Sequence, residues 1–183
     1  MDPKADSQPG SVLIVVDMQA CYLNLYKDQE YARRKIECVN RAISEARGRG
    51  MTVIFVEHEF AGFLTRMAIK LLMKGAGIRG CDGFPTDPRI DKSATDPLYL
   101  KFRGDLFSVD SLVGKLNKDG VSNILLAGQD GNYCIQESAR GGKRLGYDIT
   151  VLDSGVATNS EKRWRKEKAA LESEGIRIAP TWE

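Results

Sequence analysis

Short apolar runs and longer helical patterns alternate along this chain. The first run, residues 12–16, is continuous and rich in β-branched residues, which is typical of a parallel strand buried on both faces. The clearest helical segment, 29–47, has Ala32, Ile36, Val39 and Ile43 at three- and four-residue spacings and is followed by glycine. The predicted strands are 12–16, 52–56, 98–102, 123–127, 148–152 and 176–178. The predicted helices are 29–47, 62–74, 109–118, 133–145 and 160–174.

This order of elements predicts an α/β fold, a three-layer, doubly wound, mostly parallel sheet of six strands (Rossmann-like). No repeat or linker divides residues 11–183, which we expect to form a single domain behind a polar, disordered lead-in, residues 1–10. The segment 75–97 is rich in glycine and proline and long for a loop. Loops of that length are usually functional, so we expect it to shape a cover over a site.

Charge and composition narrow the class of protein. Lys plus Arg number 27 and Asp plus Glu 25, a net charge of +2, which argues against a nucleic-acid or membrane-surface partner. No apolar run approaches the roughly 18 residues of a membrane span, and the N-terminus lacks the apolar core of an export signal. We therefore expect a cytoplasmic protein with free thiols, in the reducing compartment where disulfides are rare. The cysteines are Cys21, Cys38, Cys81 and Cys134, with no metal-type spacing.

Three of these thiols have ordinary interpretations. Cys21 is expected to fill the core or a loop, although it could face a pocket. Cys38 is expected within a helix, in the core or on its surface, and Cys81 lies in the glycine-rich loop, where a redox or lid role is the alternative.

Candidate chemistry gathers at predicted strand ends. Asp17, His58 and Lys101 each stand where a strand ends, and the segment after Gly128 follows another. Ligands bind at the carboxyl ends of the strands in open parallel sheets, so we expect these residues to converge on one edge. His58 is the only histidine, so any His-dependent nucleophilic system would have to use it.

Cys134 follows a strand and a glycine-containing turn, close to the predicted start of a helix. A helix N-terminus favours the thiolate and offers free N–H groups for an oxyanion, but the same position suits a buried structural cysteine. An acid, a lysine and a thiol at three strand ends form a coherent nucleophilic system. Asp17 would take the thiol proton, and Lys101 would stabilise thiolate and carboxylate.

These residues carry a resemblance to a known family. The chain has VVDMQ around Asp17, a lysine six residues before Phe107, and G-x-x-x-x-x-C from Gly128 to Cys134. In this order and spacing it resembles the isochorismatase-like cysteine hydrolases, which are related to nicotinamidases, over residues 11–178. Further support comes from Ala139, Gly146, Tyr147 and Asp153.

The resemblance implies a catalytic set of Asp17, Lys101 and Cys134, in which the thiol forms an acyl-enzyme that water hydrolyses. It implies a cis peptide at Gln129–Asp130 and an oxyanion hole from the N–H groups of Asp130 and Cys134. It also implies homo-oligomers, dimers or tetramers. Nothing in the sequence requires a cofactor. Gln19, His58 and Tyr133 are candidates to line the pocket.

The chain departs from the family in two places. Residues 129–132 read Gln-Asp-Gly-Asn, whereas relatives commonly have a small apolar residue and then Thr-Asp. The nicotinamidase branch binds a metal through an Asp-x-His pair after the second strand plus another histidine. Here the region reads VEHEF and no second histidine exists, so we expect no such metal site. His58 then either lines the pocket or is a partly exposed strand-end residue.

The sequence is compatible with three functions. The first is hydrolysis of a C–N bond in a small amide, ureide or carbamoyl compound, and the presence of the thiol favours it. The second is a family member without catalysis that acts in binding or assembly, motivated by the altered turn. The third is a vinyl-ether hydrolase that needs Asp17 but not the thiol. The substrate is not specified, although Arg66, Lys70 or Arg103 could supply a cation if they are not simply on the surface.

Overall fold

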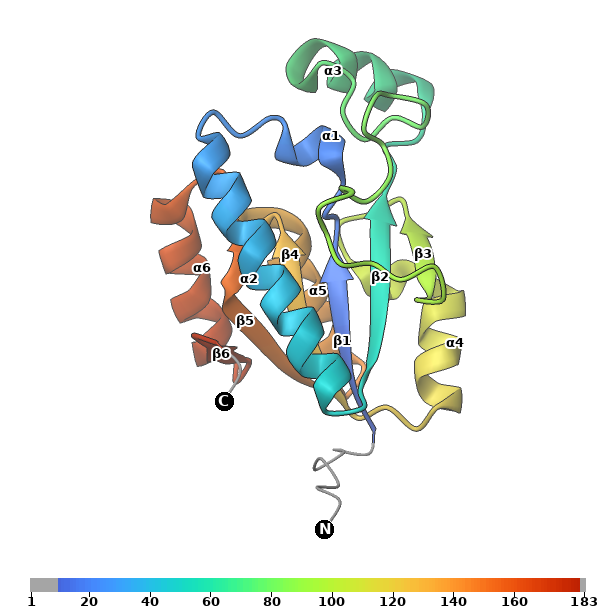
Figure 1. The fold of residues 1–183 in the computed structure, drawn as a ribbon, viewed down its shortest axis with the longest axis vertical. Coiled ribbons are helices and arrows are strands. Elements are labelled where there is room, and N and C mark those ends of the chain that lie inside the picture. The colour runs from blue at the N-terminus through green and yellow to red at the C-terminus, as the bar shows by residue number, and fades with distance from the viewer. Residues whose placement is uncertain (1–9, 182–183) are drawn as a thin grey trace.

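The computed structural model describes residues 10–181, and the expected lead-in before Gly10 lies outside them. Six parallel strands form one sheet in the order β3-β2-β1-β4-β5-β6, so the predicted doubly wound architecture is confirmed (Figure 1). The chain runs outward from the central β1 in both directions. The strands are β1 Ser11–Val16, β2 Thr52–His58, β3 Leu98–Lys101, β4 Asn123–Gln129, β5 Asp148–Ala157 and β6 Arg177–Ala179.

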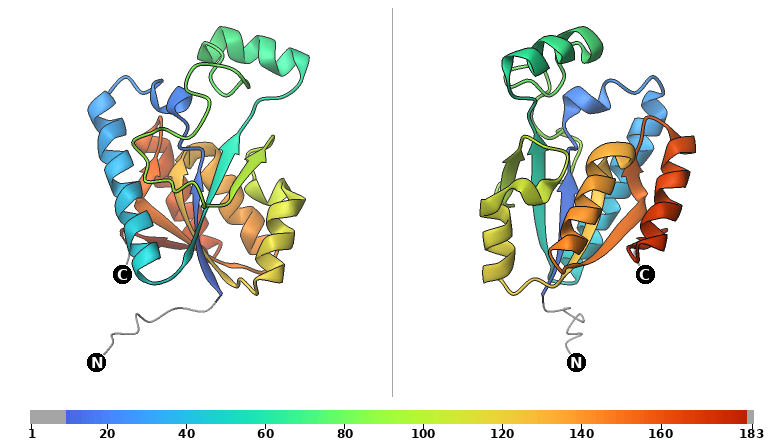
Figure 2. Two further views of the ribbon diagram at one scale, coloured as in Figure 1. Left: turned by 45° about the vertical axis from the view of Figure 1, so that its right-hand side comes forward. Right: turned by 180° about the vertical axis from the view of Figure 1, so that it is seen from behind.

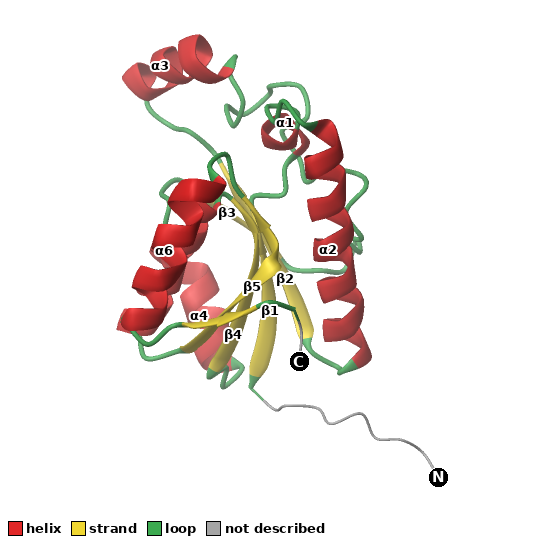
Figure 3. Cartoon of the chain, turned by 90° about the vertical axis from the view of Figure 1, so that its left-hand side faces the viewer, coloured by secondary structure: helices red, strands yellow, loops and turns green. Residues whose placement is uncertain are grey.

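Helices cover both faces of the sheet, which gives three layers (Figure 3). The long α2 packs Ile36, Val39 and Ile43 against one face, and Asp28 caps it by accepting a hydrogen bond from the Tyr31 N–H. The opposite face is covered by α4, α5 and α6, with Trp164 buried among them. The helices are α1 Ala20–Leu23, α2 Gln29–Gly48, α3 Phe63–Met73, α4 Asp110–Lys118, α5 Gln136–Arg144 and α6 Glu161–Ser173.

The third helix stands apart from these layers. The helix α3 lies beyond the carboxyl end of β2, clear of the sheet (Figures 1 and 2). The loop that follows it runs back beside the sheet, where Ile90 packs in the core with residues of α2. The predicted apolar face does form on the helix, but no residue of α3 is buried. Leu64 is 79% and Leu71 85% exposed, so this face contributes nothing to the core. Within residues 10–181 no helix is both long and apolar enough to cross a bilayer.

Strand β5 differs from its predicted form. We expected it to end at Asp153, but it continues to Ala157 through a register shift against β4 between Leu126 and Gly128. Asp153 therefore lies within the strand, where its carboxylate accepts hydrogen bonds from Trp164 Nε1 at 2.8 Å and Lys168 Nζ at 2.6 Å. Its role is to attach α6 to the sheet.

Candidate active site

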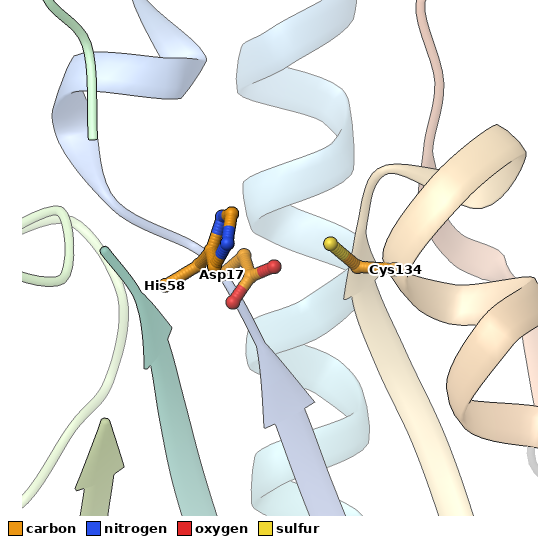
Figure 4. Close-up of side chains that lie close together, drawn as sticks. All are labelled: Asp17, His58 and Cys134. Carbon is orange, nitrogen blue, oxygen red and sulfur yellow. The ribbon is translucent and has the colours of Figure 1, made fainter. Parts of the chain in front are cut away.

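Four candidate residues meet at the carboxyl edge of the sheet. Asp17 directly follows β1, His58 ends β2, Lys101 ends β3, and Cys134 lies after β4. In Figure 4 the imidazole, the carboxylate and the sulfur approach one another from three different segments. The convergence expected from parallel strand order is thus present in the structure.

Lys101 is the centre of this cluster. Its side chain is fully buried, and its ammonium lies 2.8 Å from Asp17 Oδ2 and donates to Cys134 Sγ at 3.1 Å. The third contact is to the main-chain oxygen of Arg103, at 3.2 Å. An ammonium has three N–H donors, so this set uses all of them and fixes the charge between acid and thiol.

The backbone holds Asp17 in an unusual conformation. Its φ angle is +54°, a left-handed value that few non-glycine residues adopt and that recurs at functional sites. The Asp17 N–H donates to Val56 O at 2.8 Å, and the Gln129 side-chain amide donates to Asp17 O at 2.7 Å. These contacts with β2 and β4 direct the carboxylate into the cluster. Its Oδ2 faces Lys101, whereas Oδ1 is buried without a hydrogen-bond partner.

The turn that carries Cys134 is anchored by the residues in which the chain departs from its relatives. Gly131–Ile135 forms a π-helical turn, and the side chain of Asp130 caps it by accepting from the Asn132 N–H at 2.7 Å. The buried Asn132 amide donates to Thr158 Oγ1 and to Ser160 O, which fastens the turn to the segment between β5 and α6. At Gly131 a Cβ would lie 2.9 Å from the Trp164 ring, so the lack of a side chain permits this packing.

The Gln129–Asp130 peptide bond is cis, at the position that the resemblance implies. Gln129, Asp130 and Cys134 all line one cavity. The pairing of the Asp130 and Cys134 N–H groups as an oxyanion hole stays a prediction.

Burial dominates the titration of the cluster. It raises the pKa of the Cys134 thiol, with the charge of Asp17 adding to the rise and Lys101 opposing it. The helix-terminus argument from the sequence favoured the thiolate, and here desolvation outweighs it, so the resting form is the thiol. Burial likewise raises the pKa of Asp17 against the pull of Lys101. For Lys101, burial lowers the pKa but Asp17 and the sulfur raise it more, so the ammonium stays charged.

His58 forms one wall of the site. Its ring packs edge-on against Phe60, with ring centroids 4.5 Å apart, and its Nδ1 lies 3.3 Å from the Tyr22 hydroxyl. Burial first, and then the charge of Lys101, lowers the pKa of His58 to about 3. The imidazole is therefore neutral near neutral pH, and His58 is among the residues that line the cavity.

Gln19 does not line the cavity, contrary to our expectation. Its amide is fully buried, accepting from the His58 N–H at 2.7 Å and donating to Phe84 O at 2.7 Å. Because both ends of the amide bind main chain, Gln19 serves to join the end of β2 to the glycine-rich loop. Its polarity suggested a pocket residue, but the same polarity satisfies buried backbone groups.

The metal arrangement of the nicotinamidase branch does not fit these residues. Glu57 accepts from the N–H and hydroxyl of Thr86 at 2.7 and 2.8 Å, and Glu59 pairs with Arg79 at 2.9 Å. Both carboxylates beside His58 are thus committed to protein partners. The imidazole instead turns toward Asp17 and Cys134.

A cavity of about 680 Å³ opens above the cluster. The expected residues His58 and Tyr133 line it, and so does Arg103; Arg66 and Lys70 lie on α3 and are not among its lining residues. Most of the remaining wall is aromatic or apolar and was not expected from the sequence. These further residues are Tyr22, Leu25, Tyr26, Phe60, Met73, Phe102, Gly104, Glu137 and Asn159.

The chain belongs to the isochorismatase domain family, whose model matches residues 11–181, and the resemblance in the sequence is thereby confirmed. An isochorismatase family protein from Desulfovibrio vulgaris subsp. vulgaris str. Hildenborough has a TM-score of 0.82 at 19% identity, covering 94% of this chain and 95% of that one. An N-carbamoylsarcosine amidase from Thermoplasma acidophilum has a TM-score of 0.79 at 21% identity, covering 94% and 97%. A nicotinamidase from Bacillus subtilis has a TM-score of 0.78 at 19% identity, and the match covers 93% of this chain and 99% of that one. No curated protein matches the sequence.

Proposed function

We propose that this protein is a cysteine hydrolase that cleaves a C–N bond of a small amide, ureide or carbamoyl compound. One observation carries the proposal, the buried ammonium of Lys101 held between Asp17 Oδ2 and Cys134 Sγ. A fully buried lysine is costly unless it is paired, and pairing it with both an acid and a thiol at a cavity suits covalent catalysis.

The free oxygen of Asp17 supplies the proton acceptor. In the first step Asp17 Oδ1 takes the proton of the Cys134 thiol while the sulfur attacks the substrate carbonyl carbon. The resulting tetrahedral species collapses as the Asp17 carboxyl returns that proton to the leaving amine, and a thioester on Cys134 remains. The raised pKa of Asp17, caused mainly by burial, makes its carboxylate basic enough for this exchange.

Water completes the cycle. Asp17 Oδ1 accepts a proton from a water molecule as its oxygen attacks the thioester, the C–S bond breaks, and the proton passes to the departing sulfur. The carboxylic acid leaves and the thiol is restored. Lys101 keeps its proton throughout and stabilises whichever of the sulfur and the carboxylate is negative.

The cavity wall supports a preference among substrates. Its aromatic side chains include Tyr22, Phe60 and Phe102, and cavities of this volume hold small organic molecules. Planar or apolar compounds that carry the scissile group are therefore the substrates to test first. Relatives in structure include an amidase and a nicotinamidase, which agrees with C–N cleavage.

Release of ammonia or amine from a panel of aromatic and aliphatic carboxamides, ureides and carbamoyl amines tests the proposal. Cys134→Ala should reduce turnover about a thousand-fold or more, and Asp17→Asn by a similar factor. Cys38→Ala is the matched control, because Cys38 lies on α2 with its sulfur against Arg41 and outside the cavity lining. Full amine release by Cys134→Ala would exclude the thiol mechanism, whereas binding of panel compounds without turnover by the wild type would favour a binding protein. A vinyl-ether hydrolase would release no amine from the panel but would cleave a vinyl ether equally well with and without the thiol.

A further inference from the structure

We propose that Asp17, His58 and Cys134 also form a reversible binding site for a borderline-soft divalent cation, Zn²⁺, which blocks the hydrolase when it is bound. One ligand atom from each residue, a carboxylate oxygen, a ring nitrogen and the sulfur, lies within 4.8 Å of the other two. Figure 4 shows the three groups facing a common space at the ends of separate segments.

The acid supplies an oxygen that the protein leaves unused. Asp17 is only 2% exposed, and its Oδ1 has no hydrogen-bond partner, although a buried carboxylate oxygen normally has one. Oδ2 is held by Lys101, so a cation at Oδ1 need not break that ion pair. An orphaned oxygen directed into a cluster of other ligands is the independent observation that points to a cation.

The other two ligands suit the same ion. The Tyr22 hydroxyl, 3.3 Å from His58 Nδ1, orients the imidazole in the way that outer contacts orient histidine ligands in metal sites. A set of sulfur, nitrogen and oxygen donors favours zinc, whereas magnesium and calcium prefer oxygen alone. Three protein ligands leave the fourth tetrahedral position to water. Zinc–ligand bonds of about 2.0–2.3 Å place the ligand atoms roughly 3.5 Å from one another. Side-chain rotations that move each ligand atom by about 1 Å would therefore bring all three within bonding distance of one cation.

Lys101 limits how tightly the cation binds. Its ammonium lies 3.1 Å from Cys134 Sγ, and a dication at the sulfur would feel that charge. As the zinc–sulfur bond forms, the thiol proton leaves to solvent, and no group is oxidised or reduced. The thiolate retains a lone pair for Lys101, so the ammonium weakens binding without excluding it.

Binding of the cation should inhibit the hydrolase, and this inhibitory role rests on the proposed function. The cation occupies Cys134 Sγ and Asp17 Oδ1, which are the nucleophile and the proton acceptor of the proposed reaction. This site differs from the metal site of the nicotinamidase branch, because Glu57 and Glu59 keep their own protein partners and are not ligands of the proposed cation.

Cobalt(II) titration of the full chain, without substrate, tests the binding. We expect one equivalent to produce thiolate-to-cobalt charge-transfer absorption, which Zn²⁺ then abolishes by displacement. Cys134→Ser should remove the absorption, and His58→Gln should weaken binding about ten-fold or more. Lys101→Met should strengthen it, although the same change should abolish turnover. Circular dichroism of each variant establishes that it is folded.

A double variant, Cys21→Ser with Cys81→Ser, provides the control. These two thiols interact with each other and are not among the residues that line the cavity, so they are soft ligands outside the proposed site. The absorption should persist in this variant. Loss of the absorption there but not in Cys134→Ser would overturn the proposal, as would no absorption at any cobalt concentration.

A second measurement separates this inference from the proposed function. With an active substrate in hand, Zn²⁺ should reduce turnover in proportion to site occupancy, and a chelator should restore it. Activation by Zn²⁺ would overturn the inhibitory role. If no substrate is ever turned over, the proposed function fails, yet the cobalt titration still decides whether the site exists.

Discussion

Lys101 Nζ lies 3.1 Å from Cys134 Sγ, although 33 residues separate them in the chain. The contact depends on the parallel order of β3, β2, β1 and β4, which brings the ends of these strands to one edge. Because Asp17 shares the same ammonium, the protonation of the thiol is tied to both charges, and substitutions of either should change thiol reactivity in opposite directions.

Alkylation of Cys134 should therefore respond oppositely to two substitutions. Burial and the Asp17 charge raise the thiol pKa, so wild-type Cys134 should react slowly at pH 7 and faster as pH rises. Asp17→Asn removes the negative charge that disfavours the thiolate, so it should lower the pKa of Cys134 and speed its alkylation at pH 8. Lys101→Met removes the positive charge that favours the thiolate, so it should slow alkylation. Site-resolved mass spectrometry from pH 6 to 10 measures both rates. Equal Cys134 rates in the two variants would show that these charges do not control the thiol.

Stability should depend strongly on the buried ion pair. Lys101→Met leaves Asp17 as an uncompensated buried acid, and loss of one partner of a buried pair costs about 3–5 kcal/mol. Lys115→Met is the control, since Lys115 pairs with Asp119 one turn along α4 in an exposed position. Urea unfolding at pH 7 should show a large decrease in the free energy of unfolding for Lys101→Met and almost none for Lys115→Met. Similar losses in both would contradict the assigned burial.

The only histidine should make stability depend on pH. The pKa of His58 is about 3 in the folded chain and about 6.5 when unfolded, so between these values only the unfolded form binds the proton. Stability should fall as pH falls below about 6.5, with about 1 kcal/mol lost from pH 7 to 5.5 through this residue alone. The neighbouring titratable groups are Asp17, Tyr22, Lys101 and Cys134.

His58→Gln isolates that effect, because it removes the titration and leaves the carboxylates in place. Urea unfolding of wild type and variant should be measured at pH 7 and at pH 5.5. Between these pH values the wild type should lose about 1 kcal/mol more of its free energy of unfolding than His58→Gln does. Equal losses in the two proteins would mean that His58 is not buried in its neutral form.

Gly77 should be essential to the shape of the cavity wall. A Cβ at this position would lie 1.9 Å from the Tyr22 hydroxyl, which would force Tyr22 away from His58. Gly77→Ala should raise KM and destabilise the fold by more than Gly80→Ala does. Gly80 has a similar φ, +85° against +77°, but open space around it, so this variant carries only the conformational cost of about 1 kcal/mol. Equal effects of the two substitutions would show that Tyr22 is free to move.

The sheet and the strand-end residues could be predicted because they depend on local signals. Short apolar runs define these strands, and the first polar residue after such a run lies at the carboxyl edge, as Asp17 and Lys101 do. The extension of β5 past Asp153 could not be predicted, since Ser154 and Gly155 are typical of a turn. Only the register shift against β4 keeps them in the sheet.

The cavity wall was largely beyond prediction for a different reason. Tyr22 lies on the short helix α1, and Phe102 and Asn159 lie in loops after β3 and β5. Nothing in their immediate sequence indicates that these three segments meet. For α3 the sequence predicted burial that does not occur: the periodicity gives the helix an apolar face, but the structure leaves that face exposed. Local patterns define an element but not the surface against which it packs.

Detection of the acyl-enzyme tests the central claim most directly. Turnover of a substrate from the carboxamide panel would be stopped with acid after milliseconds to seconds, and the peptides would be weighed by mass spectrometry. We predict an added mass equal to the acyl fragment on the peptide that contains Cys134, and none in Cys134→Ala. An adduct on a different residue, or no adduct together with wild-type turnover in Cys134→Ala, would contradict the account.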